Sequence, residues 1–238
     1  LLTAPVSEIV DVTLPAVVAA PASVAPAAVR YTEYKHPNLW DGCVGAWLPP
    51  HINPGGDTAF DYSARKNHGT LTSMDPATDY VMDNEGYALT FDGSEYITLG
   101  TPPRLNSLQV PMTICGWFNE GWGGGNDTIF SQYESTSVHR LIKLVRLDGN
   151  KLNYFTSTAS GSYQKKTLDA TGTLSTNVWY FFAIVVSGTH ASPTVRLTIN
   201  RTSDTQALAA LSTSPDTSVD VQIGWQDVGG TDQDFGGM

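Results

Sequence analysis

The 238-residue sequence predicts an all-β protein, a two-sheet antiparallel β-sandwich or jelly roll with an extended N-terminal arm. From about Trp40 onward, short runs of alternating apolar and polar residues are separated by Gly and Asp at turn positions, which is typical of many short strands. No stretch keeps a helical period for more than one or two turns. We therefore divide the chain into an arm and linker over residues 1–39 and a β-domain over residues 40–238.

The arm differs from the rest of the chain in composition. Ala, Val and Pro account for 19 of the first 30 residues. Prolines recur at intervals that prevent a helix, and they break the apolar run that a signal peptide needs. These prolines are Pro5, Pro15, Pro21 and Pro26. The segment is therefore predicted to be extended.

Part of the arm, residues 6–18, is too apolar for a free linker, because an apolar segment without its own core gains by docking on a surface. We expect it either to pack back on its own domain as an extra strand or to lie across a partner subunit. Its anchoring residues are Val6, Ile9, Val10, Val12 and Leu14. Since the chain begins with Leu1 rather than Met, we expect that it has been processed or cut, or is only part of a longer sequence.

The first predicted strands of the domain lie between residues 87 and 118. Tyr87, Leu89 and Phe91 alternate with other residues up to an Asp92-Gly93 turn, and residues 96–99 resume the extended pattern. The run MTICGWF at residues 112–118 fits a strand inside a two-sheet sandwich. Its two faces carry Met112, Ile114 and Phe118 against Cys115 and Trp117. We assign Trp47, Trp117 and Trp179 to the core, since each lies within a predicted strand.

The second half of the domain continues this pattern. Residues 141–155 predict a hairpin, because an Asp148-Gly149 turn separates two alternating runs. Residues 178–188 are apolar on both faces and predict a central buried strand. Residues 194–200 and 219–223 alternate again and predict two further strands.

Charge and cysteine content exclude several classes of protein. Asp and Glu number 23 against 13 Lys and Arg, a net charge of −10, and no basic cluster exceeds Lys165-Lys166. Binding to nucleic acid and to anionic membranes is therefore disfavoured. No apolar run approaches the roughly 18 residues of a membrane span. Cys43 and Cys115 either pair once or remain apart as free thiols, and we favour free thiols.

Seven segments, taken in order, resemble the laminin-G-like members of the concanavalin A-like lectin/glucanase superfamily. They are GCVGAWLPP, DYSARKNHGTL, YALTFDGSEYITL, MTICGWF, LSTNVWYFFAIVVSG, TVRLTIN and VQIG. Their order and spacing match as well, so the resemblance covers residues 42 to 238. It implies a concanavalin A-like jelly roll for the whole β-domain.

The resemblance also interprets the stretch FDYSARKNHGTL, whose crowded polar residues suggest an active site. In the family this run is a structural corner, with side chains that bond to the backbone of the turn. The corner residues are Asp61, Ser63, Asn67, His68 and Gly69. The alternative is a Ca²⁺ site that uses Asp61 or Asp92, because this ion prefers carboxylates and loop carbonyls. The resemblance implies no other cofactor.

Two features depart from the family pattern. The family's last strand would follow Phe235-Gly236-Gly237 and lie beside the first strand, but the sequence ends at Met238. We therefore expect either more protein beyond this point or an edge open to a partner or to the arm. In addition, Asn200-Arg201 stands where the family has Asn-Gly, which affects the geometry of that hairpin turn.

The sequence does not predict an enzyme. Glucanases of this superfamily use two Glu residues around an Asp on one strand, since retaining hydrolysis needs two carboxyl groups roughly 5 Å apart. This chain has no Glu-x-Asp-x-Glu run, and no two of its Glu residues share a strand face. Motifs of metalloproteases, serine hydrolases and phosphate-binding loops are absent too.

A glycan-binding face requires aromatic side chains beside polar groups on loops at one edge of the sandwich. The candidate residues are Trp122, Tyr133, His139, Tyr163 and Trp225. The alternative for each is that it packs in the core or covers a strand edge.

The stretch from His68 to Val81 is most similar to phage-encoded members of the family. The resemblance thus implies a non-catalytic virion surface protein, either a capsid decoration or a fibre component. Its arm would bind other virion proteins or identical subunits, and its lectin-like domain would face host-surface glycans. The alternatives are a secreted bacterial carbohydrate-binding or adhesion domain and a glucanase-like hydrolase with an atypical site.

Overall fold

The computed structural model describes most of the β-domain. The described residues are 40–47, 56–75, 77–83, 86–107, 110–121, 126–133, 141–149, 151–160, 162–169, 173–213, 218–225 and 235–237. The predicted arm at residues 1–39, including its anchoring residues, lies outside this set, as do Trp122 and His139.

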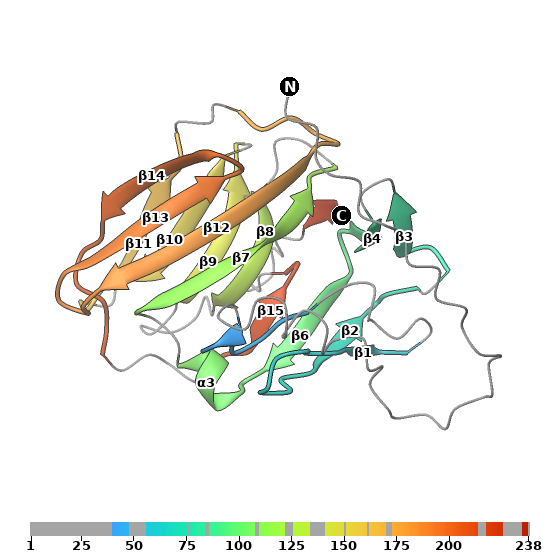
Figure 1. Ribbon diagram of the computed structural model, residues 1–238, viewed down its shortest axis with the longest axis horizontal. Coiled ribbons are helices and arrows are strands. Elements are labelled where there is room, and N and C mark those ends of the chain that lie inside the picture. The colour runs from blue at the N-terminus through green and yellow to red at the C-terminus, as the bar shows by residue number, and fades with distance from the viewer. Residues whose placement is uncertain are drawn as a thin grey trace, which may run out of the picture.

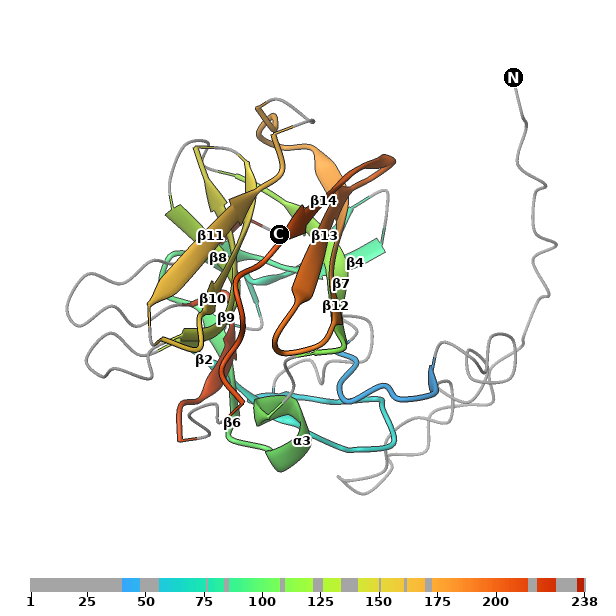
Figure 2. The same ribbon diagram turned by 90° about the vertical axis from the view of Figure 1, so that its left-hand side faces the viewer.

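Two antiparallel sheets form the body of the domain (Figures 1 and 2). The larger sheet has eight strands. In spatial order they are β1 (Thr58–Ala59), β2 (Gly69–Thr72), β6 (Tyr96–Gly100), β15 (Val221–Ile223), β8 (Asn126–Tyr133), β9 (Leu141–Asp148), β10 (Leu152–Ser157) and β11 (Tyr163–Thr167). The smaller sheet has four, β14 (Thr202–Ala207), β13 (Pro193–Ile199), β12 (Trp179–Gly188) and β7 (Met112–Asn119).

Short elements complete the described part of the chain. They are the pair β16 (Gly236–Gly237) with β5 (Phe91–Asp92), the pair β3 (Tyr80–Asp83) with β4 (Gly86–Leu89), and the helix α3 (Pro103–Asn106). The turn at Asp92 and Gly93 joins strands of different sheets, because β5 pairs with β16 whereas β6 pairs with β2 and β15. Among the described residues, no helix is long and apolar enough to cross a bilayer.

One hydrophobic core lies between the two sheets. Alternation within each strand points every second side chain toward the facing sheet. Its apolar side chains with 0% exposure include Ile184, Val186, Val195 and Leu197 from the smaller sheet, and Ala59, Val145, Leu152 and Val221 from the larger. This arrangement confirms the predicted two-sheet sandwich.

The expected hairpins form where the turn residues placed them. β9 pairs with β10 across the turn that contains Gly149, and β13 pairs with β14 across Asn200-Arg201. The expectation of a strand buried on both faces is wrong for β12. This strand buries every second residue from Phe182 to Val186, while Phe181 and Val185 on its other side remain partly exposed. Cys43 and Cys115 are free thiols, as expected.

Candidate functional site

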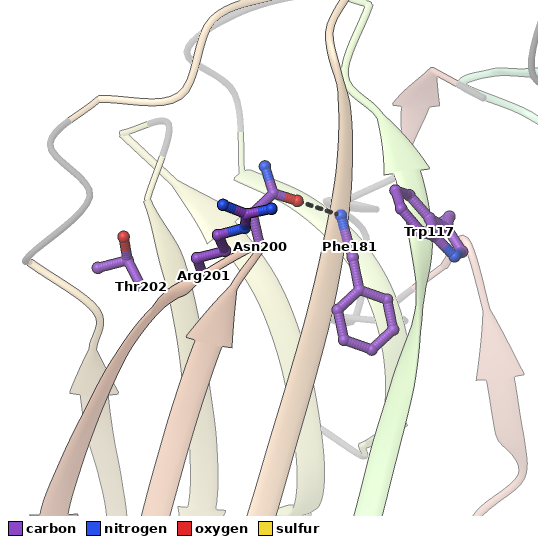
Figure 3. Close-up of a pocket in the computed structure, with 5 residues that line it drawn as sticks. All are labelled: Trp117, Phe181, Asn200, Arg201 and Thr202. Atoms are coloured by element: carbon purple, nitrogen blue, oxygen red, sulfur yellow. Dashed lines mark hydrogen bonds between the residues drawn. The ribbon is translucent and has the colours of Figure 1, made fainter. Parts of the chain in front are cut away.

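Two aromatic side chains lie side by side on the outer face of the smaller sheet. Trp117 on β7 is directly opposite Phe181 on β12, with ring centroids 5.5 Å apart and an angle of 59° between the ring planes. Trp117 is 67% exposed. Their chain neighbours Phe118 and Phe182 point into the core, so strand alternation forces this aromatic pair outward. Figure 3 shows both side chains beside the β13–β14 turn.

The β13–β14 turn forms the polar side of this site. Asn200 takes a positive φ of 50° at the first position of a two-residue turn, a conformation that Asn tolerates better than most residues. Its backbone N–H donates to the Phe181 carbonyl at 2.8 Å, and its Oδ1 accepts from the Phe181 N–H at 2.9 Å. Asn200 thereby ties the turn to the aromatic strand, and Arg201 and Thr202 follow it at the edge of the site.

These five residues line a surface hollow of about 630 Å³: Trp117, Phe181, Asn200, Arg201 and Thr202. The hollow combines the exposed Trp117 ring and the partly exposed Phe181 ring with an amide, a guanidinium and a hydroxyl. Rings of this kind can pack against the apolar C–H faces of a flat ligand, while the polar groups bond to its hydroxyls. None of its five lining residues belongs to a phosphate-binding loop or a nucleophile–base pair. The arrangement therefore suits the binding of a ligand that has both apolar faces and hydroxyl groups.

Sequence reasoning missed this site because it assigned Trp117 to the core. That assignment is wrong: the side chain faces solvent. Trp47, in contrast, packs against the core, and its indole N–H donates to the Asn67 carbonyl at 3.1 Å. The alternation within residues 112–118 does place Cys115 and Trp117 on one shared face, which was the available signal.

The loop residues proposed as glycan contacts do not come together in the described part of the chain. Trp122 and His139 lie outside it, and only the backbone of Tyr133 is described, within β8. Tyr163 is 72% exposed at the start of β11. Trp225 is partly buried and stacks on Tyr96, with centroids 4.8 Å apart.

Strand register separates Tyr163 from Trp225. Ile223 of β15 aligns through β8, β9 and β10 with Lys166 of β11, and β15 and β11 run in the same direction. Along this direction, Trp225 lies two residues past Ile223, whereas Tyr163 lies three residues before Lys166. With four strand spacings between them, the two residues are roughly 25 Å apart and cannot contact one small ligand together.

The corner around Asp61 is built from side-chain hydrogen bonds to backbone. One Asp61 oxygen accepts from the N–H groups of Ala46 and Ser63, both at 2.8 Å. The other accepts from the Ser63 hydroxyl at 2.8 Å and the Asn67 N–H at 2.7 Å. All four acceptor positions of the carboxylate are therefore occupied.

Two further residues complete the corner. His68 Nδ1 accepts from the Asp61 N–H at 2.9 Å, which fixes the orientation of the imidazole at that edge. Gly69 lies so close to β6 that an added Cβ would be 2.6 Å from the Ile97 side chain, and only Gly fits there. Among the residues that the structure describes, no group of three or more His, Cys, Asp or Glu could hold a metal ion.

Asp92, the other candidate calcium residue, is exposed and belongs to a turn with Ser94 and Glu95. Burial alone would raise the pKa of the Glu95 carboxyl, but donors from Asp92 and Ser94 outweigh it and lower that pKa to about 2. The Asp92 pKa is raised, first by its hydrogen bond with Glu95 and then by the Glu95 charge. The two carboxylates thus organise the turn that leads into β6.

Comparison with known proteins gives one family and a set of similar folds. The profile of a family described as "Concanavalin A-like lectin/glucanases superfamily" matches residues 91–238, more than half of the chain. Among curated proteins, no sequence matches this chain.

Three solved structures are similar to this chain. The binding domain of Paraclostridial Mosquitocidal Protein 1 has a TM-score of 0.56 at 14% identity, covering 78% of this chain and 44% of its own. The receptor binding domain of botulinum neurotoxin C/D mosaic serotype has a TM-score of 0.53 at 11% identity, covering 78% and 43%. Domain 4 of AbnA, a GH43 extracellular arabinanase from Geobacillus stearothermophilus in complex with arabinotriose, has a TM-score of 0.48 at 16% identity. The match covers 74% of this chain and 81% of that domain. This chain spans less than half the length of the mosquitocidal-protein and neurotoxin chains that it matches.

Proposed function

Because the chain belongs to the concanavalin A-like lectin/glucanases superfamily, we propose that it is a non-catalytic carbohydrate-binding domain. Its glycan contact is the hollow beside Trp117 and Phe181. The observation that carries this proposal is the 67% exposure of Trp117 on an otherwise well-packed sheet. Trp is among the side chains that most gain from burial, so an exposed Trp paired with a second ring marks a contact surface.

The size of the site sets the expected affinity. A ligand that covers on the order of 100–200 Å² of ring surface gains roughly 2–5 kcal/mol from apolar burial. Ordering of the ligand offsets part of this gain, and hydrogen bonds from the turn add to it. We therefore expect dissociation constants on the order of 0.1–1 mM for a short oligosaccharide. Repeated copies of the domain would raise the apparent affinity through avidity.

Two further points support a binding role. The two toxin domains with this fold are described as binding domains, one of them as receptor binding. The chain also lacks the Glu-x-Asp-x-Glu run of the superfamily's glucanases. Release of reducing sugar from any glucan in a broad substrate panel would reject the non-catalytic part of the proposal.

The setting that we propose is the surface of a virion. What supports it is the similarity of residues 68–81 to phage-encoded members of the family and the apolar character of residues 6–18. The arm would attach the domain to other virion proteins or to identical subunits, leaving the aromatic site free for host glycans. The alternative setting is a secreted bacterial adhesion or carbohydrate-binding domain, which would use the same surface.

The binding surface is tested by affinity electrophoresis of the full chain against a panel of soluble polysaccharides. Trp117→Ala is compared with Trp122→Ala and Trp225→Ala, the two indoles proposed from the sequence. Retardation that only Trp117→Ala abolishes supports the site on the smaller sheet. If Trp122→Ala or Trp225→Ala abolishes it while Trp117→Ala does not, the binding face lies on the loops and the Trp117 site is rejected.

The setting is tested separately by removing residues 1–39. Loss of particle association with retained glycan binding supports the arm as a virion anchor. Association that survives the deletion rejects that role. A protein recovered only as a free monomer from culture medium favours the secreted alternative.

A further inference from the structure

The outer face of the smaller sheet is positively charged in an otherwise acidic protein. The four strands of this sheet, all within the described residues, contain only two charged side chains, Arg196 and Asp204. Asp204 is opposite Leu197, which is 0% exposed, so by alternation it lies on the inner side of the sheet, where it is exposed on the edge strand β14 and accepts from Gln206 Nε2 at 2.9 Å. Arg196, opposite Thr205, lies on the outer face, and Arg201 joins it from the β13–β14 turn.

Arg201 is placed to meet a ligand on the aromatic pair. It is exposed and lines the same hollow as Trp117 and Phe181 (Figure 3). Within the described residues it forms no ion pair, so no carboxylate of that part of the chain competes with a ligand for its guanidinium. The protein's net charge of −10 would repel anions in general, which makes the two arginines a specific feature, since no acidic side chain of these four strands shares the outer face with them.

We propose that the ligand is an acidic glycan whose carboxylate binds Arg201 while its sugar ring packs on Trp117 and Phe181. This inference rests on the proposed carbohydrate-binding function and specifies the ligand class. The planar guanidinium matches a carboxylate with two parallel hydrogen bonds, which gives both strength and orientation. Asn200 and Thr202 supply neutral polar groups for the remaining hydroxyls.

The second arginine sets a minimum length for the ligand. Arg196 on β13 is directly opposite Val185 on β12, and Val185 lies four residues along β12 from Phe181. Four residues of strand correspond to about 13 Å. The surface between the two arginines carries Thr198 and Ser203, and Ser203 accepts from Arg196 Nη2 at 3.0 Å. A uronate-containing oligosaccharide, rather than a single sugar, therefore spans the face, with one carboxylate near each arginine.

The test compares a uronate polymer with its neutral ester and with two polyanions that lack carboxylates. The full chain is run in affinity gels with polygalacturonate, with its methyl-esterified neutral form, with a sulfated polysaccharide and with DNA. The variants are Arg201→Gln and Arg196→Gln, with Arg104→Gln as the matched control. Arg104 is an exposed arginine on α3, at the end of the domain away from the β13–β14 turn (Figures 1 and 2).

We expect the wild type to bind polygalacturonate more tightly than its ester and to lose affinity as salt increases. Arg201→Gln should weaken polygalacturonate binding about tenfold, since a charge-assisted hydrogen-bond pair is lost, and leave the ester unaffected. Arg196→Gln should also weaken binding of polygalacturonate and leave binding of the ester unaffected. Arg104→Gln should change neither, and unchanged urea midpoints verify that each variant is folded.

Each contrary result has a distinct meaning. Equal binding of the ester, unaltered in Arg201→Gln but lost in Trp117→Ala, overturns the acidic ligand and leaves the carbohydrate-binding function in place. If the sulfated polysaccharide or DNA binds as tightly as its charge density would predict, the protein does not select carboxylates, and the assignment of a uronate ligand is overturned. Failure of the wild type to bind any glycan rejects the binding function itself.

Discussion

Trp117 and Phe181 face each other across β7 and β12 with ring centroids 5.5 Å apart, and neither ring belongs to the core that the two strands cover. The residues next to them in sequence, Phe118 and Phe182, form that core and are 2% and 3% exposed. The same pair of strands therefore carries an aromatic layer on each face, one of them structural and the other free to contact a ligand.

Paired truncations on β7 should separate these two layers. Phe118→Ala removes a buried ring that contacts Tyr180, Phe182 and Phe235, and we expect it to lower the free energy of unfolding by about 3–5 kcal/mol. Trp117→Ala should lower it by less than about 1 kcal/mol, because only an exposed cross-strand contact is lost. Urea unfolding of both variants measures the difference. Similar losses for the two would mean that Trp117 is part of the core.

The β13–β14 turn depends on the conformation of Asn200. Asn200→Gly keeps the positive φ and loses only the Oδ1 bond to the Phe181 N–H, so we expect stability within about 0.5 kcal/mol of wild type. Asn200→Ala strains the same φ and should cost about 1–2 kcal/mol. The Gly variant should nevertheless bind glycans a few-fold more weakly, since it loses the Asn200 amide and one of the two hydrogen bonds that tie the turn to Phe181. Chemical unfolding and affinity electrophoresis are the two measurements; equal destabilisation by Gly and Ala would contradict the role of φ.

Local patterns explain why much of the fold could be predicted from sequence. Alternation and turn residues are properties of a few adjacent positions, so the β9–β10 hairpin at Gly149 and the strand over residues 193–199 were predictable. The superfamily resemblance rests on the same segments in order, and the family match at residues 91–238 confirms it.

Which face of a strand meets the second sheet is not a local property. In residues 112–118 both faces carry apolar side chains, so alternation groups Cys115 with Trp117 without saying that this face is the outer one. The separation of Tyr163 from Trp225 depends on the order of five strands in the larger sheet, which arises from pairings distant in sequence. For this reason the sequence suggested loop aromatics and missed the exposed pair on the smaller sheet.

The corner at Asp61 should behave as a structural unit without calcium. Asp61→Ala leaves the N–H groups of Ala46, Ser63 and Asn67 without their acceptor, so we expect a loss of about 3 kcal/mol or more. Asp61→Asn retains one acceptor oxygen and should lose less. Since both carboxylate oxygens are occupied, millimolar Ca²⁺ should not raise the melting temperature of the wild type. A rise that Asp61→Ala abolishes would instead identify Asp61 as a calcium ligand.

Acid stability should report on the turn at Glu95. The Glu95 pKa of about 2 in the folded protein lies below the ordinary Glu value near 4.3. The charged form of Glu95 therefore stabilises the fold fully at pH values above about 4.3. This stabilisation should fade as pH falls from about 4.3 toward 2, as Glu95 takes up a proton. Asp92, whose pKa is raised, binds its proton more tightly in the folded state and offsets part of the loss. Urea midpoints across this range measure the net effect: Glu95→Gln should flatten the profile, whereas Asp92→Asn should steepen it. An unchanged slope in Glu95→Gln would assign the acid sensitivity to other carboxylates.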